Sequence, residues 1–380
     1  MTAANTDEAN TDERPGEPPA AGARKAVFSA TPAQVTAIAT AIAIVASAGG
    51  RDPLSSLGAG TVQAASRYVL GQPAAAGALA EGTVLPSTVA ADELASLVPD
   101  PWEAEVTTRL LAVAALADGA FDGAKVDRLL AYADALGVTG DYLHQIELGA
   151  AGDAVEMGRD MMRENLRSIP GIGWDEQWSP ADVERALAPY VDAAADPALA
   201  ASYQRLADCP PGSLGRSFFD FYDRYGFSFP GDAGALNEHF ATRHDATHLL
   251  SGYNTSLQGE LLVSTFTATM HEVNAMSGHI IPVIVSWHVG TQVNEVARHA
   301  TGAYDPEKFF VAWARGAATT TDTFDPAWSL WEHADGDIDE LRADYGIGPL
   351  DRRFASTMPV PAKGDVHRPA GGDRPEAQGS

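Results

Sequence analysis

Histidines are the residues of this chain best suited to chemistry, and they gather in one stretch. Of ten histidines, seven lie between His239 and His299. His244 and His248 are four residues apart, the spacing that places two side chains on one face of a helix. Two imidazoles so placed can bind one divalent cation. Asp245 is expected to be either a flanking ligand or an acceptor for a histidine N–H.

Local sequence signals predict two consecutive helices around this pair. Residues 237–250 are expected to form the first helix, because an asparagine stands at the position of its N-cap. The next four residues, Ser-Gly-Tyr-Asn, are typical of a helix stop followed by a turn. Thr255 and Gln258 then match a capping box, so a second helix is expected to begin near Ser256. The pattern predicts an antiparallel helical hairpin.

The second helix should supply a further ligand. Glu260 follows the predicted start by four residues and His248 precedes the predicted stop by three, so the two lie at a similar depth in the hairpin. Two imidazoles with carboxylates suit zinc or ferrous iron. The alternative is a buried polar cluster that holds the two helices together. We expect a metal site whose ligands, and catalytic residues, are His244, Asp245, His248 and Glu260.

Two classes of hydrolase that use histidines fit this pattern less well. In an H-D-x-x-H metalloprotease, Asp245 would take the general-base place that glutamate usually holds, and its shorter side chain reaches water less well. A phosphohydrolase of the HD type needs a separate upstream histidine and a distant downstream aspartate. His239 and His144 are the upstream candidates, and neither lies at a suitable spacing.

The order H-D-x-x-H, eleven residues and then E resembles the zinc-binding signature of the coenzyme Q biosynthesis protein four family. The flanking motifs extend this resemblance over about 150 residues, from Ala201 to Leu350. They are Pro211-Gly212-Ser213-Leu214-Gly215-Arg216, Arg243, Leu250-x-Gly252-Tyr253, Gln258-Gly259-Glu260, Phe309-Phe310-x-Ala312-Trp313-x-x-Gly316, Trp328-x-x-x-Trp331 and Ile338-Asp339-Glu340-Leu341-Arg342-x-x-Tyr345-Gly346-Ile347. Ser213 stands where the family usually has threonine, and the N-terminal half has no counterpart there.

The resemblance implies a function in ubiquinone biosynthesis. Members of the family are helical peripheral membrane proteins that bind a prenylated quinone precursor or a lipid and associate with other enzymes of the pathway. They are implicated in removing the ring carboxylate and hydroxylating that carbon. Carried to this chain, the resemblance predicts a metal-dependent oxidative decarboxylase with zinc or ferrous iron at His244, Asp245, His248 and Glu260. The alternative is a lipid-binding scaffold of a biosynthetic complex without catalysis.

An acidic turn in the N-terminal half carries a second resemblance. Residues 115–123, Ala-Leu-Ala-Asp-Gly-Ala-Phe-Asp-Gly, lie between two predicted helices and are similar to a turn of the tellurite-resistance TerB-like helical domain. A calcium-binding EF-hand that starts at Asp118 is excluded, because Ala120 and Leu129 occupy two of its ligand positions. Metal binding at this turn competes with a plain helix–helix turn, for which Asp and Gly are good formers.

Apolar residues recur mostly at three- and four-residue spacing, and alternating β-branched runs are nearly absent. We therefore expect an all-α protein with two helical bundle units and disordered termini. The predicted divisions are a tail (1–27), a helical segment (28–85), the TerB-like domain (86–170), a linker with a helix at 180–194 (171–200), the metal-binding domain (201–352) and a second tail (353–380).

Charge and cysteine usage narrow the classes of partner. The chain has 25 Lys+Arg against 51 Asp+Glu, a net charge of −26, which excludes a nucleic-acid binder because phosphate contacts need clustered cations. A single cysteine excludes an intrachain disulfide and fits a cytoplasmic protein. Residues 26–50 carry no charge, but the clean helical part, 33–48, is shorter than the about 20 residues that a membrane span needs. A buried helix is the favoured interpretation, and peripheral contact with a membrane stays compatible.

Overall fold

The computed structural model describes residues 30–85, 89–172, 195–293 and 299–363. It confirms an all-α protein, since no strand occurs in these ranges. An isolated β-bridge between Ser213 and Asp337 is not part of any strand. The helices of the first half are α1 (Pro32–Ala46), α2 (Ser56–Tyr68), α3 (Ala91–Leu97), α4 (Pro101–Leu116), α5 (Gly123–Leu136), α6 (Asp141–Ala151) and α7 (Ala154–Arg167). Those of the second half are α9 (Pro197–Gln204), α10 (Leu214–Tyr225), α11 (Glu238–Ser251), α12 (Leu257–His271), α13 (Ile281–Ile284), α14 (Pro306–Ala318), α15 (Leu330–His333) and α16 (Ile338–Asp344).

Aspartate side chains begin many of these helices. The carboxylates of Asp100, Asp122, Asp196 and Asp305 accept hydrogen bonds from backbone N–H groups in the first turns of α4, α5, α9 and α14. These N–H groups have no partner within the helix, and an anion there also complements the helix dipole. Part of the chain's acidity is therefore used to define helix starts.

The uncharged segment near the N-terminus forms α1, which is buried among α2, α3, α4 and α5. Thr31 and Gln34 form a reciprocal capping box at its start, and ten of its residues are buried. The helix has 15 residues. No helix in the described part of the chain has both the length and the apolar character required to cross a membrane.

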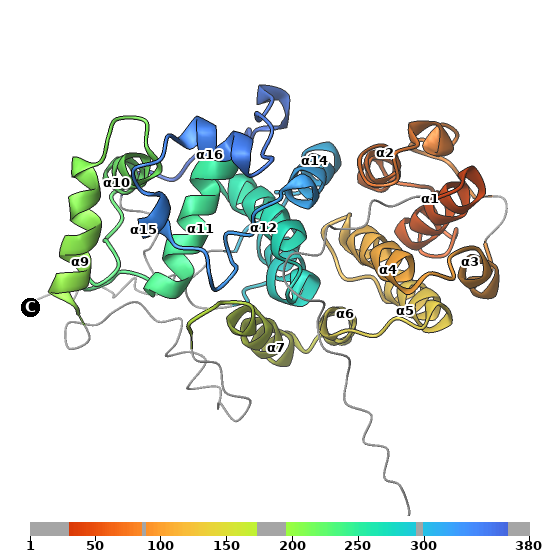
Figure 1. The fold of residues 1–380 in the computed structure, drawn as a ribbon. Helices are drawn as coiled ribbons and strands as arrows, with labels where there is room; N and C mark the ends of the chain where they lie inside the picture. Colours follow the sequence, from red (N-terminus) through yellow and green to blue (C-terminus); the bar gives the residue numbers. More distant parts are fainter. Residues whose placement is uncertain (1–29, 86–88, 173–194, 294–298, 364–380) are drawn as a thin grey trace, which may run out of the picture.

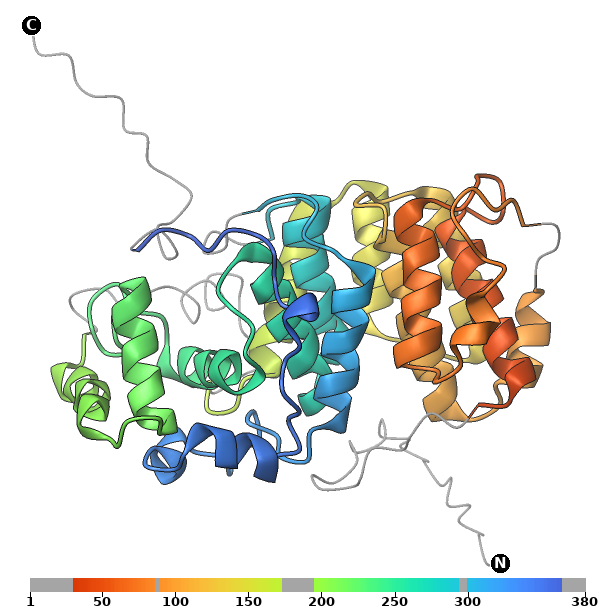
Figure 2. The same ribbon diagram turned by 90° about the horizontal axis from the view of Figure 1, so that it is seen from above.

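The two halves of the chain pack directly on each other through α2 and α14. The Thr61 hydroxyl lies 2.8 Å from the Tyr304 hydroxyl, and the Tyr68 hydroxyl donates to the Glu307 carboxylate at 2.8 Å. Buried apolar side chains of both halves belong to one contiguous cluster. Figure 2 shows α1–α5 at one end of the molecule, α9 and α10 at the other, and α12 and α14 between them.

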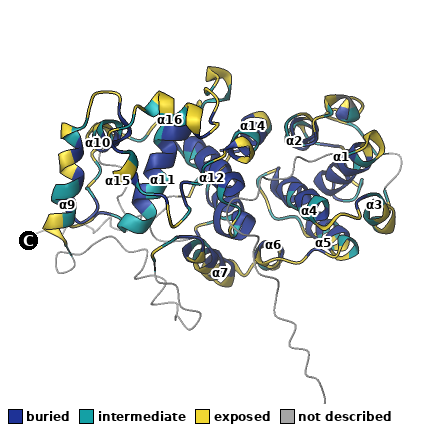
Figure 3. Cartoon of the chain, viewed as in Figure 1, coloured by how far each residue is buried: buried dark blue, intermediate teal, exposed yellow. Residues whose placement is uncertain are grey.

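Helix α12 lies at the centre of this arrangement and is buried along most of its length (Figure 3). It crosses α14 closely at Gly316, where a Cβ atom would lie 2.2 Å from the Phe266 carbonyl oxygen. It then leads through a turn into two π-helical segments, Ala275–Ile280 and Val285–Val289, on either side of α13. Segments with this wider hydrogen-bonding pattern are often found at functional sites.

Some predictions fall on residues that the structure does not describe. The helix predicted at 180–194 and most of both predicted tails lie outside the described ranges. The second predicted tail begins with residues 353–363, which are described. There the Ser356 hydroxyl lies 2.5 Å from the Ser256 hydroxyl, and the Thr357 N–H donates to the Gln258 side chain at 3.0 Å. This segment therefore rests against the start of α12.

Candidate metal centre

The predicted helical hairpin is formed by α11 and α12. Asn237 caps α11, with its side chain accepting from the His239 N–H at 2.9 Å, and Gly252 ends the helix in the left-handed conformation at φ 83°. Ser256 caps α12 by accepting from the Gly259 N–H at 3.0 Å. The capping box predicted from Thr255 is therefore wrong: Ser256 is the cap, and Gly259, three residues later, has no side chain to complete a box. Both helix boundaries otherwise lie where the sequence places them.

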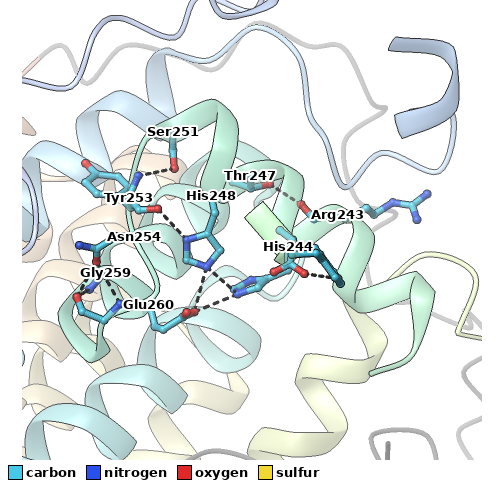
Figure 4. Close-up of polar contacts among 12 residues, drawn as sticks. Arg243, His244, Thr247, His248, Ser251, Tyr253, Asn254, Gly259 and Glu260 are labelled. Carbon is cyan, nitrogen blue, oxygen red and sulfur yellow. Dashed lines mark hydrogen bonds and ion pairs between the residues drawn. The ribbon is translucent and has the colours of Figure 1, made fainter. Parts of the chain in front are cut away.

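The hairpin brings three of the predicted ligands together (Figure 4). Glu260 Oε2 lies 3.1 Å from His244 Nε2 and 3.2 Å from His248 Nε2, and the two Nε2 atoms are 3.2 Å apart. The His248 side chain is 1% exposed, whereas those of His244 and Glu260 are 17% and 16% exposed. The cluster is thus buried on the His248 side and reachable from solvent on the other.

The ring of His248 is oriented by the turn that follows α11. Its Nδ1 lies 2.9 Å from the carbonyl oxygen of Tyr253. Because a carbonyl oxygen can only accept, Nδ1 carries the proton, and Nε2 of the neutral ring then presents its lone pair. That lone pair faces a carboxylate oxygen and the second imidazole. Two lone-pair-bearing nitrogens and a carboxylate oxygen this close together need a proton or a metal cation between them. A backbone carbonyl that accepts from the other ring nitrogen, and so fixes the tautomer, is common for histidines that bind metals.

Electrostatics at the cluster also favour a bound positive charge. Burial acts to raise the pKa of Glu260, but the charge of His248 and hydrogen bonds from both imidazoles outweigh it and hold that pKa well below its ordinary value. Burial acts to lower the pKa of His248, but Glu260 and Asp245 outweigh it and raise that pKa. Both shifts show that the carboxylates here stabilise a cation at the imidazole nitrogens.

Asp245 is placed beside the cluster by an aromatic residue from α10. One potential ligand atom from each of His244, Asp245 and His248 lies within 4.8 Å of the others. The Tyr222 hydroxyl donates to Asp245 Oδ2 at 2.6 Å, and both residues are buried. Burial and the neighbouring carboxylate raise the pKa of Tyr222 well above its ordinary value, so its hydroxyl stays protonated and donates. Sequence reasoning did not predict this role for Tyr222.

The donor atoms fit the size of a small divalent cation. In a tetrahedral zinc site with bonds of about 2.0–2.1 Å, neighbouring ligand atoms are about 3.3 Å apart. The three distances among His244 Nε2, His248 Nε2 and Glu260 Oε2, from 3.1 to 3.2 Å, come close to one face of such a tetrahedron. Two nitrogens and a carboxylate oxygen also suit ferrous iron. The residues present therefore fit either metal.

Two arginines support the C-terminal turn of α11, which carries His248. Arg342 donates to the carbonyls of Leu249 and Leu250 at 2.6 and 3.1 Å, and Arg315 donates to that of Ser251 at 2.9 Å. The last carbonyls of a helix have no partner within it, so cations there stabilise its end. Arg342 belongs to one of the motifs that carry the family resemblance, but its role at the end of α11 could not be predicted from that motif.

The acidic turn of the N-terminal half is engaged within the protein. Asp118 pairs with Lys125 and accepts from the Ser55 hydroxyl at 2.5 Å, while Asp122 caps α5. A buried lysine next to Asp118 already supplies the positive charge at this carboxylate. The geometry favours the plain helix–helix turn over a metal site.

Five more histidines of the stretch between His239 and His299 lie outside the cluster, and three of them, His271, His279 and His288, have side chains inside the protein. His271 bonds to Asp322 through Nδ1 at 2.7 Å and to the Ser168 carbonyl through Nε2 at 3.2 Å. His279 and His288 are buried, as expected of core histidines, but each has one ring nitrogen without a hydrogen-bond partner among the described residues.

No protein-family model, curated protein or solved structure matched this chain in the three comparisons made. The family resemblance therefore rests on the residues of this chain alone.

Proposed function

We propose that this protein binds a divalent metal ion, zinc or ferrous iron, through His244, His248 and Glu260 with Asp245 beside them. The observation that carries the proposal is the near-equilateral triangle of two imidazole nitrogens and one carboxylate oxygen, with edges of 3.1–3.2 Å. The tautomer that the Tyr253 carbonyl imposes on His248 supports it further, because the lone pair of Nε2 points into that triangle.

For the ligand, we propose a prenylated quinone precursor that carries a ring carboxylate. A bound cation would supply Lewis acidity toward a carboxylate or phenolate oxygen. The ring of Phe240 stacks on His244 with centroids 4.9 Å apart, and that of Phe221 lies 5.9 Å from His248. These aromatic faces would favour a flat ring beside the cluster. The motif resemblance to the ubiquinone-biosynthesis family points to the same class of ligand.

The proposed reaction replaces the ring carboxyl group by a hydroxyl group. It breaks the bond between the ring carbon and the carboxyl carbon, forms a C–O bond at the same ring carbon and releases CO₂. The substrate as a whole is oxidised by two electrons, one formally from the ring carbon and one from the carboxyl carbon, so the balance consumes the equivalent of half a molecule of O₂. The chain's own residues would orient the carboxylate at the exposed side of the triangle, where His244 and Glu260 are reachable from solvent.

The second candidate, supported by the same aromatic faces, is a lipid-binding scaffold without catalysis.

Elemental analysis of the purified protein tests the metal proposal. Wild-type protein should carry one zinc or iron per chain, and His248→Ala and Glu260→Gln should each carry far less. His239→Ala is the matched control, because His239 lies on the same helix outside the triangle and should leave the metal content unchanged. Metal-free wild-type protein after incubation with either ion would refute the proposal.

Turnover separates the enzyme from the scaffold. The metal-loaded protein would be given a carboxylated prenyl-phenol and O₂, and CO₂ and the hydroxylated ring measured. An enzyme loses turnover in His248→Ala while it still binds the decarboxylated ring. A scaffold binds the ring equally in both proteins and releases no CO₂ in either.

A further inference from the structure

The face of α12 that carries Glu260 stays polar far beyond the metal cluster. At 100° per residue, Ser264, Thr267 and His271 all lie within about 40° of Glu260 around the helix. Ser264 and Thr267 are buried and His271 is half-buried. The opposite face packs on α14, where the Thr269 hydroxyl donates to the Trp313 carbonyl at 2.9 Å. A continuous polar stripe inside a helical protein needs partners for its polar atoms.

Near the far end of this stripe, two buried polar atoms have no hydrogen-bond partner among the described residues. They are Oγ1 of Thr267, whose residue is 1% exposed, and Nε2 of His279, whose residue is 6% exposed. Other threonines of α12 donate to backbone carbonyls of their own helix: the hydroxyl of Thr265 donates to the Leu261 carbonyl at 2.7 Å. Thr267 could do the same within its own helix but does not. Its hydroxyl is therefore buried without a partner among the described residues.

Both atoms lie next to His271. Thr267 precedes His271 by one helical turn, which places the two side chains about 5–6 Å apart. The rings of His271 and His279 lie edge to face with centroids 6.3 Å apart, and Phe324 packs on both rings. Thr267 belongs to α12 and His279 to the first π-helical segment, and these two elements pack on each other. Thr267 and His279 therefore lie on two sides of His271.

His271 cannot satisfy either atom, because both of its ring nitrogens are occupied. Nδ1 lies 2.7 Å from Asp322 Oδ2 and Nε2 lies 3.2 Å from the Ser168 carbonyl. Both contacts use the ring nitrogens of His271, which leaves neither of them for Thr267 or His279. The hydroxyl of Thr267 and Nε2 of His279, which donates when the ring carries its proton there, then remain without a partner among the described residues. This combination selects an acceptor oxygen, most strongly one with negative charge.

We propose that Thr267 and His279 form a second ligand subsite, which binds a carboxylate or similar acceptor oxygen of a molecule whose other end is held at the metal cluster. This inference rests on the proposed function, because the first end needs the metal. Thr267 is seven residues from Glu260 on nearly the same face, about 10 Å along α12. The subsite therefore selects ligands with two oxygen groups separated by a spacer of that length.

Linear carboxylates test the subsite without knowledge of the natural ligand. Suberate, an eight-carbon dicarboxylate, can extend from the cluster toward Thr267, octanoate has the same length but one carboxylate, and succinate is too short. Titration calorimetry on the zinc-loaded full-length protein should give an affinity for suberate about tenfold or more above those for octanoate and succinate. Thr267→Val and His279→Phe should each remove that preference and leave octanoate affinity and zinc content unchanged.

Thr265→Val is the matched control, because Thr265 is buried on the same helix but faces away from the stripe and bonds to its own backbone. It should keep the suberate preference. Equal affinities for suberate and octanoate in zinc-loaded wild-type protein would overturn the subsite, as would a preference that survives in both variants. Failure to bind zinc at all would instead overturn the proposed function, and the subsite with it, so zinc content is measured first.

Discussion

The carboxylate of Glu260 and the imidazole of His248 belong to different helices, yet their nearest oxygen and nitrogen atoms lie 3.2 Å apart. The contact depends on a turn of five residues, from Gly252 to Ser256, that lets α12 return alongside α11. It also depends on the Tyr253 carbonyl within that turn, which holds the other nitrogen of His248. The geometry of one short turn therefore sets both the position and the tautomer of a metal ligand.

Removal of one hydroxyl group from α10 should weaken metal binding. Tyr222→Phe deletes the donor to Asp245, and loss of a partner that orients a metal-site residue typically reduces affinity about 10–100-fold. A competition titration with a zinc chelator of known affinity measures the change. Tyr225→Phe on the same helix is the control and should bind zinc as the wild type does. Equal affinity in Tyr222→Phe would mean that the hydrogen bond from Tyr222 to Asp245 does not support metal binding.

The start of α12 should not tolerate a methyl group at Gly259. A Cβ atom there would lie 1.9 Å from the Asn254 carbonyl oxygen, so helix and turn would have to separate. We expect Gly259→Ala to reduce the free energy of unfolding by about 2 kcal/mol or more. It should also lower zinc affinity, because Glu260 is the next residue. Gly123→Ala, where a Cβ atom meets nothing within 4 Å, is expected to change stability by less than about 0.5 kcal/mol. Urea unfolding compares the two.

Stability should fall on acidification because His279 is buried in its neutral form. Burial and the neighbouring His271 lower the pKa of His279 from 6.5 to about 3. In the unfolded chain the imidazole takes up a proton near pH 6.5, whereas in the folded protein it does not until about pH 3. The unfolded state therefore binds more protons in this range, and stability decreases as the pH falls. From pH 7 to 5 the contribution of His279 should be a loss of about 2 kcal/mol.

This contribution is isolated by a comparison of metal-free wild type with His279→Gln. Between pH 7 and pH 5, the unfolding free energy of the wild type should fall by about 2 kcal/mol more than that of His279→Gln. A difference that does not vary with pH would show that His279 takes up its proton over the same pH range in the folded and unfolded states.

Metal removal should destabilise the whole chain. A ligand that binds only the folded state adds about 2.7 kcal/mol at a concentration 100 times its dissociation constant. We therefore expect excess zinc to raise the melting temperature of wild-type protein and a chelator to reverse the rise. Glu260→Gln should show almost no response. Glu332→Gln, at an exposed position on α15, should respond as the wild type does. A rise of equal size in Glu260→Gln would place the zinc elsewhere.

The hairpin and its three convergent side chains could be predicted because their causes are local. The caps at Asn237 and near Ser256 define the ends of the helices, and helical rise then sets the depth of Glu260. Even here the capping residue is Ser256 rather than Thr255, since adjacent hydroxyl residues compete for the same role.

The partners of these residues could not be predicted, because they come from distant parts of the chain. Tyr222 is 23 residues from Asp245, and His271 contacts Ser168 across 103 residues. The π-helical segments were also missed. Their side-chain pattern differs little from that of an α-helix, and the wider turn depends on the surrounding packing.

The contact between α2 and α14 has a practical consequence for experiments that divide the chain. A fragment beginning at residue 201 would uncover apolar surface of α14 and deprive the Tyr304 hydroxyl of Thr61. Such a fragment is expected to associate with itself or with other hydrophobic surfaces, and this adhesion would be mistaken for affinity toward lipids. Lipid-binding measurements are therefore informative only on the undivided protein.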